Sequence, residues 1–233
     1  MKNNTAIKRD FYLIETMAWL HEASAGAAGY RSGFLFLDMH LERLKRSALF
    51  FGFNYPEKRI KKSLEGLSSR LSRRVFEKTM KFKVRCVLHP SGLFEATNVD
   101  EIQDVPAPVG VDISSRTVDH GDIFLYHKTS RRELFDGERR RLEKAGIFET
   151  VFLNTRRELT QGTITNLFLD MGGQALLTPA LTCGLLPGIL RQALIEEGRA
   201  REAFLVLDDL KKARSLFVGN SVRGLLRAEI RLQ

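Results

Sequence analysis

A segment that suits neither a helix nor a strand divides this chain into two parts. The segment is QDVPAPVG, residues 103–110, and its two prolines interrupt both the helical and the strand periodicity of the sequence. Strand and helix patterns occur on both sides of it. The sequence therefore predicts a mixed α/β (α+β) protein with a small lobe over residues 1–102, a linker over 103–110 and a larger lobe over 111–233.

The first part contains two helical patterns and one clear strand pattern. Apolar residues recur at helical spacing after Asp38, which is typical of an N-cap, and this pattern ends near Gly52. A second apolar stripe begins after Pro56, a residue that suits the first turn of a helix. Apolar residues alternate with mostly basic ones over residues 81–89, which predicts a half-buried strand. Two further strands are expected at residues 11–20 and 34–37, separated by a Gly- and Ala-rich turn at 26–33.

The second part alternates short apolar runs with amphipathic stretches. We expect strands at residues 111–115, 151–154, 165–170, 175–177, 204–207 and 216–219, and helices at 131–144, 188–197 and 209–213.

The formal net charge of +9 raises the question of an anionic partner. The basic residues gather at 58–62, 70–74 and 139–141, all in segments with helical periodicity, and are interpreted as solvated helix faces. No motif of a nucleic-acid-binding domain accompanies them, so we expect a small anionic substrate and no nucleic acid.

Composition also limits the compartment and the chemistry. The two cysteines, Cys86 and Cys183, have no spacing typical of metal ligands or of a disulfide framework, so no metal is expected. No apolar run approaches the roughly 18–20 residues that span a bilayer. The first ten residues lack the apolar core of a secretion signal. A cytoplasmic protein without membrane association is the expectation.

Two basic residues have a chemical as well as a structural explanation. Lys128 follows Phe124, Leu125 and Tyr126 closely, and partial desolvation would lower the pKa of its amine and make it nucleophilic. Arg43 in HLERL, on the first turns of an expected helix, has the geometry to bind a phosphate through two N–H groups. A solvated lysine and a surface arginine are the plain alternatives.

Three further stretches contain glycine at a turn. Residues 159–168, LTQGTITNLF, lead from a polar turn into a strand, and residues 218–225, VGNSVRGL, put small polar residues at a strand end. Residues 185–191, LLPGILR, put Pro and Gly at a helix start, where N–H groups without intrahelical partners suit an anion. A hairpin, a surface turn and an ordinary helix cap would also explain them. Motifs of the GxGxxG, Walker, HExxH and GxSxG types are missing from the sequence.

Taken together and in this order, these features resemble the aminodeoxychorismate lyase branch of the class IV aminotransferases, the pyridoxal-phosphate enzymes of fold type IV. The similar stretches extend from residue 13 to 228; they are LIETMAW, LDMHLERLKRSALFFGF, HKTSRRELFD, ELTQGTITNLFL, LLTPALTCGLLPGILRQALIEEG and LFVGNSVRGLLRA. The short N-terminal stretch, ETMAW and GNSVRGL are most similar to the lyase part of fused synthase–lyase proteins.

The resemblance implies roles for individual residues. The catalytic lysine that binds the cofactor corresponds to Lys128, and the arginine that binds its phosphate corresponds to Arg43. Further phosphate contacts correspond to Ile189 and Leu190 at the helix start and to Asn220 at the late strand end.

Position 161 departs from the family pattern. The residue that faces the pyridine nitrogen corresponds to Gln161, where the family usually has glutamate. A carboxylate would keep that nitrogen protonated, because it raises the pKa of a nearby cation, and a neutral amide does not. We interpret this substitution as favouring a lyase over a transaminase.

The resemblance implies a two-lobed fold with the cofactor between the lobes and a reaction that converts 4-amino-4-deoxychorismate into 4-aminobenzoate, a folate precursor, and pyruvate. This substrate has two carboxylates, for which Thr16, Arg85 and Arg132 are the expected contacts, with Arg131 and Arg223 as further candidates. A branched-chain or D-amino-acid transaminase and a non-catalytic binding protein of the same fold are the alternatives. A homodimer is expected, with the apolar stripes of the two early helices serving partly as its interface, and a synthase is a possible second partner.

Overall fold

The structure, a computed structural model, describes residues 10–22, 31–73 and 79–231. It consists of two compact units: Met1–Ile102 with Lys128–Arg131, and Gln103–His127 with Arg132–Gln233. Some residues named above lie outside the described residues: most of the expected turn at 26–33, the residues considered for a secretion signal except Asp10, and Arg74 of the second basic cluster. The segment that contains Lys128 thus belongs to the first unit, although the sequence on both sides of it belongs to the second.

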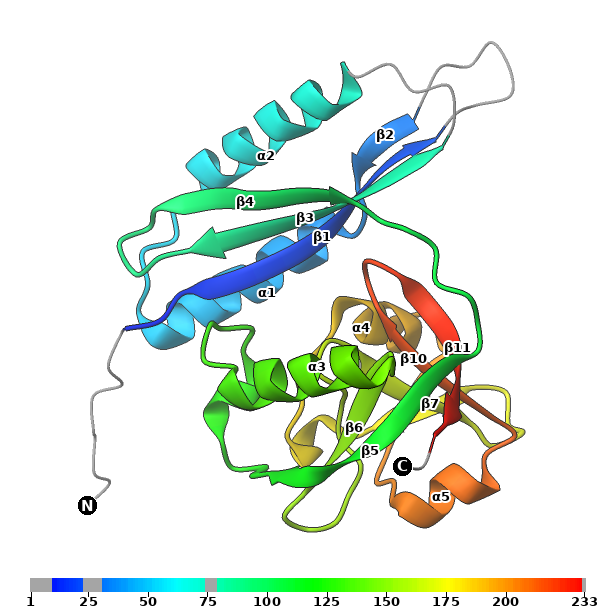
Figure 1. Cartoon of the computed structure of the whole chain (residues 1–233). Helices are drawn as coiled ribbons and strands as arrows, with labels where there is room; N and C mark the ends of the chain where they lie inside the picture. The colour runs from blue at the N-terminus through cyan, green and yellow to red at the C-terminus, as the bar shows by residue number, and fades with distance from the viewer. Residues whose placement is uncertain (1–9, 23–30, 74–78, 232–233) are drawn as a thin grey trace, which may run out of the picture. The chain divides into compact units, whose positions relative to one another are not determined.

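The first unit is built on an antiparallel four-stranded sheet with the order β2-β1-β3-β4 (Figure 1). Its central strands are β1 (Leu13–Glu22) and β3 (Met80–Leu88), and its edges are β2 (Arg31–Phe34) and β4 (Phe94–Glu101). The predicted alternation in β3 is confirmed, because Phe82, Val84, Cys86 and Leu88 are buried and the basic residues between them are not.

Two helices cover one face of this sheet. Helix α1 (Leu37–Phe51) and helix α2 (Glu57–Ser72) meet the odd-numbered side chains of β1: Glu15 bonds to α1, and the Trp19 indole donates to Ser68 of α2 at 2.9 Å. Since alternate residues of a strand point to opposite faces, the even-numbered side chains of β1 lie on the other face, which has no helix among the described residues of the first unit and is called the helix-free face.

The apolar stripes of both helices are buried in the first unit itself. The stripe residues are at most 7% exposed; they are Leu41, Leu44, Ala48, Phe51, Ile60, Leu64, Leu67 and Leu71. The expectation that these stripes form a subunit interface is therefore wrong, because they stabilise the core of their own unit. The helix ends are close to those predicted, although Phe36, not Asp38, is the N-cap of α1, and Gly52 is its left-handed C-cap.

The second unit is a mixed seven-stranded sheet with the order β6-β5-β11-β10-β7-β8-β9 (Figure 1). Neighbouring strands are parallel in the pairs β5–β6, β5–β11 and β8–β9, and antiparallel in the others. The strands are β5 (Val109–Val118), β6 (Glu149–Asn154), β7 (Asn166–Asp170), β8 (Leu176–Pro179), β9 (Ala200–Ala203), β10 (Ser215–Asn220) and β11 (Gly224–Ile230). The helices are η1 (Ile123–Tyr126), α3 (Glu133–Ala145), η2 (Leu181–Cys183), α4 (Ile189–Glu196) and α5 (Leu207–Lys212).

Some of the expected elements differ from the structure. Residues 204–207 are not a strand: the strand is β9, just before them, and Phe204 is 65% exposed. The edge strand β4 and the strand β11 were not expected. After Phe94 every residue of β4 is exposed, so that strand has no apolar alternation in the sequence. Strand β5 begins at Val109, inside the expected linker.

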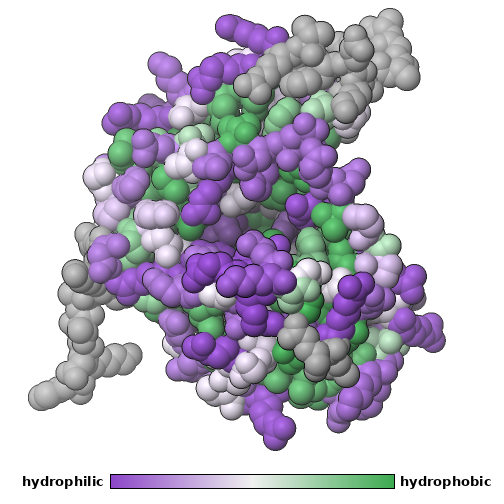
Figure 2. All heavy atoms as spheres, viewed as in Figure 1, coloured by the Kyte–Doolittle hydropathy of each residue, from purple (hydrophilic) through white to green (hydrophobic). Residues whose placement is uncertain are grey.

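The surface of α2 is polar where its basic cluster lies. Hydrophilic side chains gather over the place of α2 in Figure 2, and Lys58, Arg59, Lys61 and Lys62 of this helix are exposed, as expected for a solvated face. Among the helices of the described residues, none is long and apolar enough to cross a membrane.

Candidate functional site

Lys128 lies beside the first strand of the small sheet. Its carbonyl oxygen accepts a hydrogen bond from the Ile14 N–H at 2.8 Å, and the Ser130 N–H donates to the Tyr12 carbonyl at 2.9 Å. Leu13 and Thr129 form an antiparallel bridge between these bonds. The short segment 128–130 therefore extends the sheet next to β1, and the backbone of Lys128 is fixed one residue from Glu15.

A buried ionic cluster joins β1 to α1. The carboxylate of Glu15 accepts from Nε of Arg43 at 2.9 Å and from a terminal guanidinium nitrogen of Arg43 at 2.6 Å, a bidentate arrangement. The same carboxylate is 2.7 Å from Nδ1 of His40. All three residues are at most 5% exposed. Arg43, the expected phosphate ligand, is thus held in one orientation by Glu15.

The electrostatics of this cluster keep Glu15 ionised and His40 neutral. Burial alone would raise the pKa of Glu15, but the charge of Arg43, the interaction with the His40 ring and the hydrogen bonds to both residues lower it to about 2. Burial lowers the pKa of His40, and the positive charges of Arg43 and Lys128 act in the same direction against the effect of Glu15. Lys128 is therefore close enough to His40 to influence its titration, and the cluster and the lysine belong to one electrostatic environment.

One atom of the cluster has no hydrogen bond. Nε2 of His40 is buried and has no hydrogen-bond partner among the described residues. Unsatisfied buried polar atoms are uncommon in folded proteins and concentrate where a ligand or a reaction needs them. Glu15 was not expected as a functional residue, although it directly precedes the expected contact Thr16 in the ETM motif.

The helix-free face of the small sheet carries two of the expected substrate contacts. Thr16 of β1 is directly opposite Arg85 of β3, so the two side chains lie on the same face and next to each other. Arg85 is half-buried, and its guanidinium has no ion pair or hydrogen bond with any residue in the described part of the chain. A half-buried guanidinium of this kind suits an anionic ligand.

In the second unit a buried carboxylate organises the glycine-containing turn. Glu149, at the start of β6, is fully buried, and its two oxygens accept five hydrogen bonds. The donors are the N–H groups of Thr150, Thr163 and Ile164 at 2.8–3.1 Å and the hydroxyls of Thr163 and Thr165 at 2.6 and 2.9 Å. Sequence patterns did not indicate Glu149, because most of its partners lie 14 or more residues away along the chain.

The same carboxylate explains the glycine at position 162. A Cβ at Gly162 would lie 2.5 Å from the carboxyl carbon of Glu149, closer than real Cβ contacts allow. The turn thus requires glycine because the backbone approaches the acid directly.

Gln161 begins this turn and contacts the stretch before α4. Its side-chain oxygen accepts from the Leu186 N–H at 3.0 Å, while Asn166 donates from Nδ2 to the Leu186 carbonyl at 3.1 Å. Gln161 is 7% exposed. The turn and the start of α4 are therefore joined through Leu186.

The start of α4 lies next to the end of β10. Gly188 is the N-cap of α4, and the first intrahelical hydrogen bond runs from Gln192 to Gly188, so Ile189 and Leu190 have N–H groups without intrahelical acceptors. A Cβ at Gly219 would lie 2.9 Å from a methyl carbon of Leu190, which brings the strand end and the helix start together.

The side chain of Asn220 is used inside its own turn. Its oxygen accepts from the N–H groups of Val222 and Arg223, both at 3.0 Å, and Nδ2 donates to the Ile164 carbonyl at 3.1 Å. Asn220 thus connects the β10–β11 turn to the glycine-containing turn.

Three of the arginines considered for substrate carboxylates have protein partners. Arg131 forms an ion pair with Asp10 at 2.5 Å in the first unit. In the second unit, Arg132 pairs with Asp136 at 2.7 Å and donates to the Thr163 carbonyl at 3.1 Å, and Arg223 donates to the Gln103 carbonyl at 3.0 Å.

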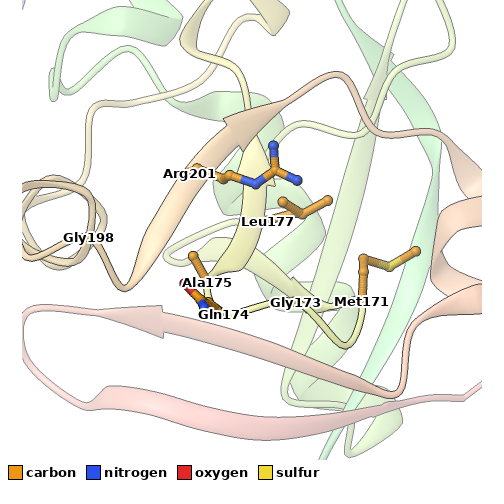
Figure 3. Close-up of a pocket in the computed structure, with 7 residues that line it drawn as sticks. All are labelled: Met171, Gly173, Gln174, Ala175, Leu177, Gly198 and Arg201. Atoms are coloured by element: carbon orange, nitrogen blue, oxygen red, sulfur yellow. The ribbon is translucent and has the colours of Figure 1, made fainter.

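A surface pocket of the second unit contains none of these residues. It has a volume of about 480 Å³, and Figure 3 shows its lining residues, with Arg201 beside Leu177; the others are Met171, Gly173, Gln174, Ala175 and Gly198. Arg201 is its single charged residue, so the pocket lacks the converging polar groups of a catalytic site.

Comparisons with known proteins find relatives that match most of this chain. A candidate amino-acid aminotransferase of Mesorhizobium loti has a crystal structure that is 38% identical in sequence, with a TM-score of 0.80 over 95% of this chain and all of that one. A candidate aminodeoxychorismate lyase of Schizosaccharomyces pombe is 25% identical over 211 residues, 88% of this chain and 87% of the relative.

A more distant structure contains the cofactor. The PLP-bound form of a hypothetical aminotransferase from Mycobacterium tuberculosis is 18% identical, with a TM-score of 0.74 over 97% of this chain and 83% of that one, which shows the shared fold. Residues 13–229 match the amino-transferase class IV family. The chain therefore belongs to the class IV aminotransferases, a family of enzymes that depend on pyridoxal 5'-phosphate.

Proposed function

We propose that the protein is a 4-amino-4-deoxychorismate lyase. In the net reaction the ring carbon that bears the amino group loses a proton, the bond from the neighbouring ring carbon to the enolpyruvyl oxygen breaks, and the enolpyruvate takes up a proton to become pyruvate. The ring becomes aromatic as 4-aminobenzoate, and no water or oxidant is consumed.

The residues of each unit suit one part of pyridoxal phosphate. We propose that Lys128 binds the cofactor covalently and that Arg43 binds its phosphate. The N–H groups of Ile189 and Leu190, which have no intrahelical acceptors, are suitable phosphate donors at a helix start. Asn220 would contribute by fixing the neighbouring strand end, and Gln161 by facing the ring nitrogen.

When bound, pyridoxal phosphate supplies an electron sink for the charge that develops as the substrate loses its proton. Nζ of Lys128 is the proposed base that removes this proton and the acid that returns a proton to the leaving group. His40, kept neutral by burial and by nearby positive charges, does not compete for that proton at neutral pH. Glu15 is a positioning residue, because it orients Arg43 and balances part of the positive charge around Lys128.

The neutral side chain at position 161 is the observation that favours a lyase over a transaminase. An amino transfer depends on a strongly electron-withdrawing, protonated ring, which a carboxylate at this position would maintain. Elimination has a second driving force, since a leaving group departs and an aromatic ring forms. Gln161 is therefore more compatible with elimination than with amino transfer.

The substrate has two carboxylates, which suits the basic side chains on the helix-free face of the small sheet. Of the expected contacts, Arg85 beside Thr16 fits best, because the Arg85 guanidinium has no protein anion as a partner among the described residues. Arg132 already binds Asp136 and the Thr163 carbonyl, so we propose a lesser role for it.

We further propose a cytoplasmic homodimer that receives its substrate from a synthase, since the substrate requires prior replacement of a hydroxyl group by an amino group. The 4-aminobenzoate product would serve folate synthesis.

Two parallel assays test the proposal. The cofactor-loaded protein is given 4-amino-4-deoxychorismate in one assay, and a branched-chain or D-amino acid with a 2-oxo acid in the other. Release of pyruvate in the first and negligible amino transfer in the second are expected. The reverse outcome would make the protein a transaminase, as the relationship to the Mesorhizobium loti protein suggests.

An Arg85→Met variant should raise KM more than it lowers kcat, because a binding contact is removed.

A further inference from the structure

The orientation of the Gln161 amide determines what it can bind. The group that faces its side chain from the α4 side is the Leu186 N–H, at 3.0 Å. A backbone N–H can only donate, so the atom it meets must be the amide oxygen and not the nitrogen. Within the described residues Nε2 donates to no protein acceptor, which leaves the NH2 group as the part of the side chain available to a ligand.

The surroundings hold this orientation. Asn166 bonds the Leu186 carbonyl, so the Leu186 peptide is fixed from both sides. A Cβ at Gly188 would lie 1.9 Å from the side-chain oxygen of Asn166, so the start of α4 approaches that amide directly. On the other side of Gln161, Gly162 is in contact with the buried Glu149, whose oxygens bond the following turn. Rotating the Gln161 amide by half a turn would put two donors face to face at Leu186.

We propose that Gln161 donates a hydrogen bond from Nε2 to an unprotonated ring nitrogen of the bound cofactor. This inference rests on the proposed function, in which Gln161 faces the ring. A protonated ring nitrogen is itself a donor and would oppose the NH2 group, whereas an unprotonated nitrogen is an acceptor and matches it. Gln161 would thus select the neutral form of the ring, and a glutamate here would select the charged form.

Other charges near the turn do not offset this preference. Among the described residues of the second unit, the charged side chains bonded to the turn are Glu149, which accepts five hydrogen bonds, and Arg132, which donates to the Thr163 carbonyl and pairs with Asp136. The carboxylate of Glu149 is saturated by donors of the turn, and the charges of Arg132 and Asp136 compensate each other. Gln161 is therefore the residue of this turn that decides the protonation state of the ring.

The consequence is a specificity for the reaction type. A neutral ring withdraws electrons less strongly than a protonated one, which penalises amino transfer more than an elimination that forms an aromatic product. Gln161 is thereby a specificity-determining residue and not merely a tolerated substitution.

Nitrogen NMR of the full chain loaded with pyridoxal phosphate, labelled with ¹⁵N in the ring, tests the inference without an activity assay. Neutral and protonated pyridine nitrogens resonate far apart. We expect the neutral signal in the wild-type protein and the protonated signal in Gln161→Glu, whose carboxylate still accepts from Leu186. Gln174→Glu, which adds the same charge at an exposed site of the second unit, should keep the neutral signal.

The outcomes separate the two proposals. Borohydride reduction and peptide mapping of the same samples report whether Lys128 carries the cofactor. A protonated signal in the wild type with the label on Lys128 overturns only the inference about Gln161. A neutral signal in Gln161→Glu would mean that another residue faces the ring, and this also overturns it. If the signal is that of free cofactor and no label reaches Lys128, the proposed function fails as well.

Discussion

At the scale of single residues, Glu15 is the group whose charge most affects the first unit. Its pKa is about 2 in the folded chain against an ordinary value of 4.5, which corresponds to about 3 kcal/mol of stability. Because the pKa is lowered on folding, this contribution is complete above pH 4.5 and is lost as the pH falls toward 2. The lowered pKa of His40 acts in the same direction, since the unfolded chain takes up a proton there below pH 6.5.

Replacing Glu15 by glutamine should therefore lower the free energy of unfolding and make it depend less on pH in the acid range. Arg43 would lose its buried counter-charge, for which we expect a loss of about 3–5 kcal/mol at neutral pH. The further loss between pH 4.5 and 2 should be smaller in the variant than in the wild type. Urea unfolding followed by circular dichroism at several pH values measures both, with the exposed Glu65→Gln as control. Parallel acid profiles of wild type and Glu15→Gln would contradict this account.

Gln161 should control the balance between two reactions. In Gln161→Glu we expect amino transfer to rise about tenfold relative to elimination, or about 1.4 kcal/mol of barrier. The measurement compares initial rates of both reactions in the variant and the wild type. Equal changes in the two rates, or no change in either, would refute this interpretation of position 161.

At the scale of elements, the glycine-containing turn depends on direct contact between its backbone and Glu149. Gly162→Ala would force a methyl group against the acid and should destabilise the protein by about 1–3 kcal/mol. Gly137→Ala is the matched control, because Gly137 lies inside α3 and a Cβ added there would have no neighbouring atom within 4 Å. That change should stabilise by about 0.5–1 kcal/mol. Equal effects of the two substitutions in thermal unfolding would exclude the proposed contact.

The elements that the sequence predicted are those whose own residues carry a pattern. Strand β3 alternates and helices α1 and α2 have apolar stripes, so each was visible locally. Strand β4 has no buried pattern, because it is an exposed edge strand. Glu15 and Glu149 were not identified as functional for a related reason. The hydrogen-bond donors that bind each carboxylate lie far away in the sequence; Arg43, for example, is 28 residues from Glu15. The expected site residues came from motif order, and their roles remain predictions.

At the scale of the whole molecule, class IV aminotransferases commonly act as dimers. The stripes of α1 and α2 are internal, so the proposed homodimer would use another surface. On the outer side of α1, Leu49 and Phe50 are 68% and 52% exposed, and such side chains favour burial by a second copy. Light scattering at micromolar concentration should give twice the 26.5 kDa of the chain. A mass of one chain would contradict the homodimer.

In the proposed reaction Lys128 moves the proton of the elimination, and Gln161 favours elimination over amino transfer. The most direct test is a mass balance on the cofactor-loaded protein incubated with 4-amino-4-deoxychorismate, in which pyruvate and 4-aminobenzoate are quantified together. The two products should form in equal amounts with the wild-type protein, and Lys128→Ala should form neither although it still binds some cofactor through its phosphate. Unequal products, or undiminished turnover by Lys128→Ala, would contradict the proposed reaction.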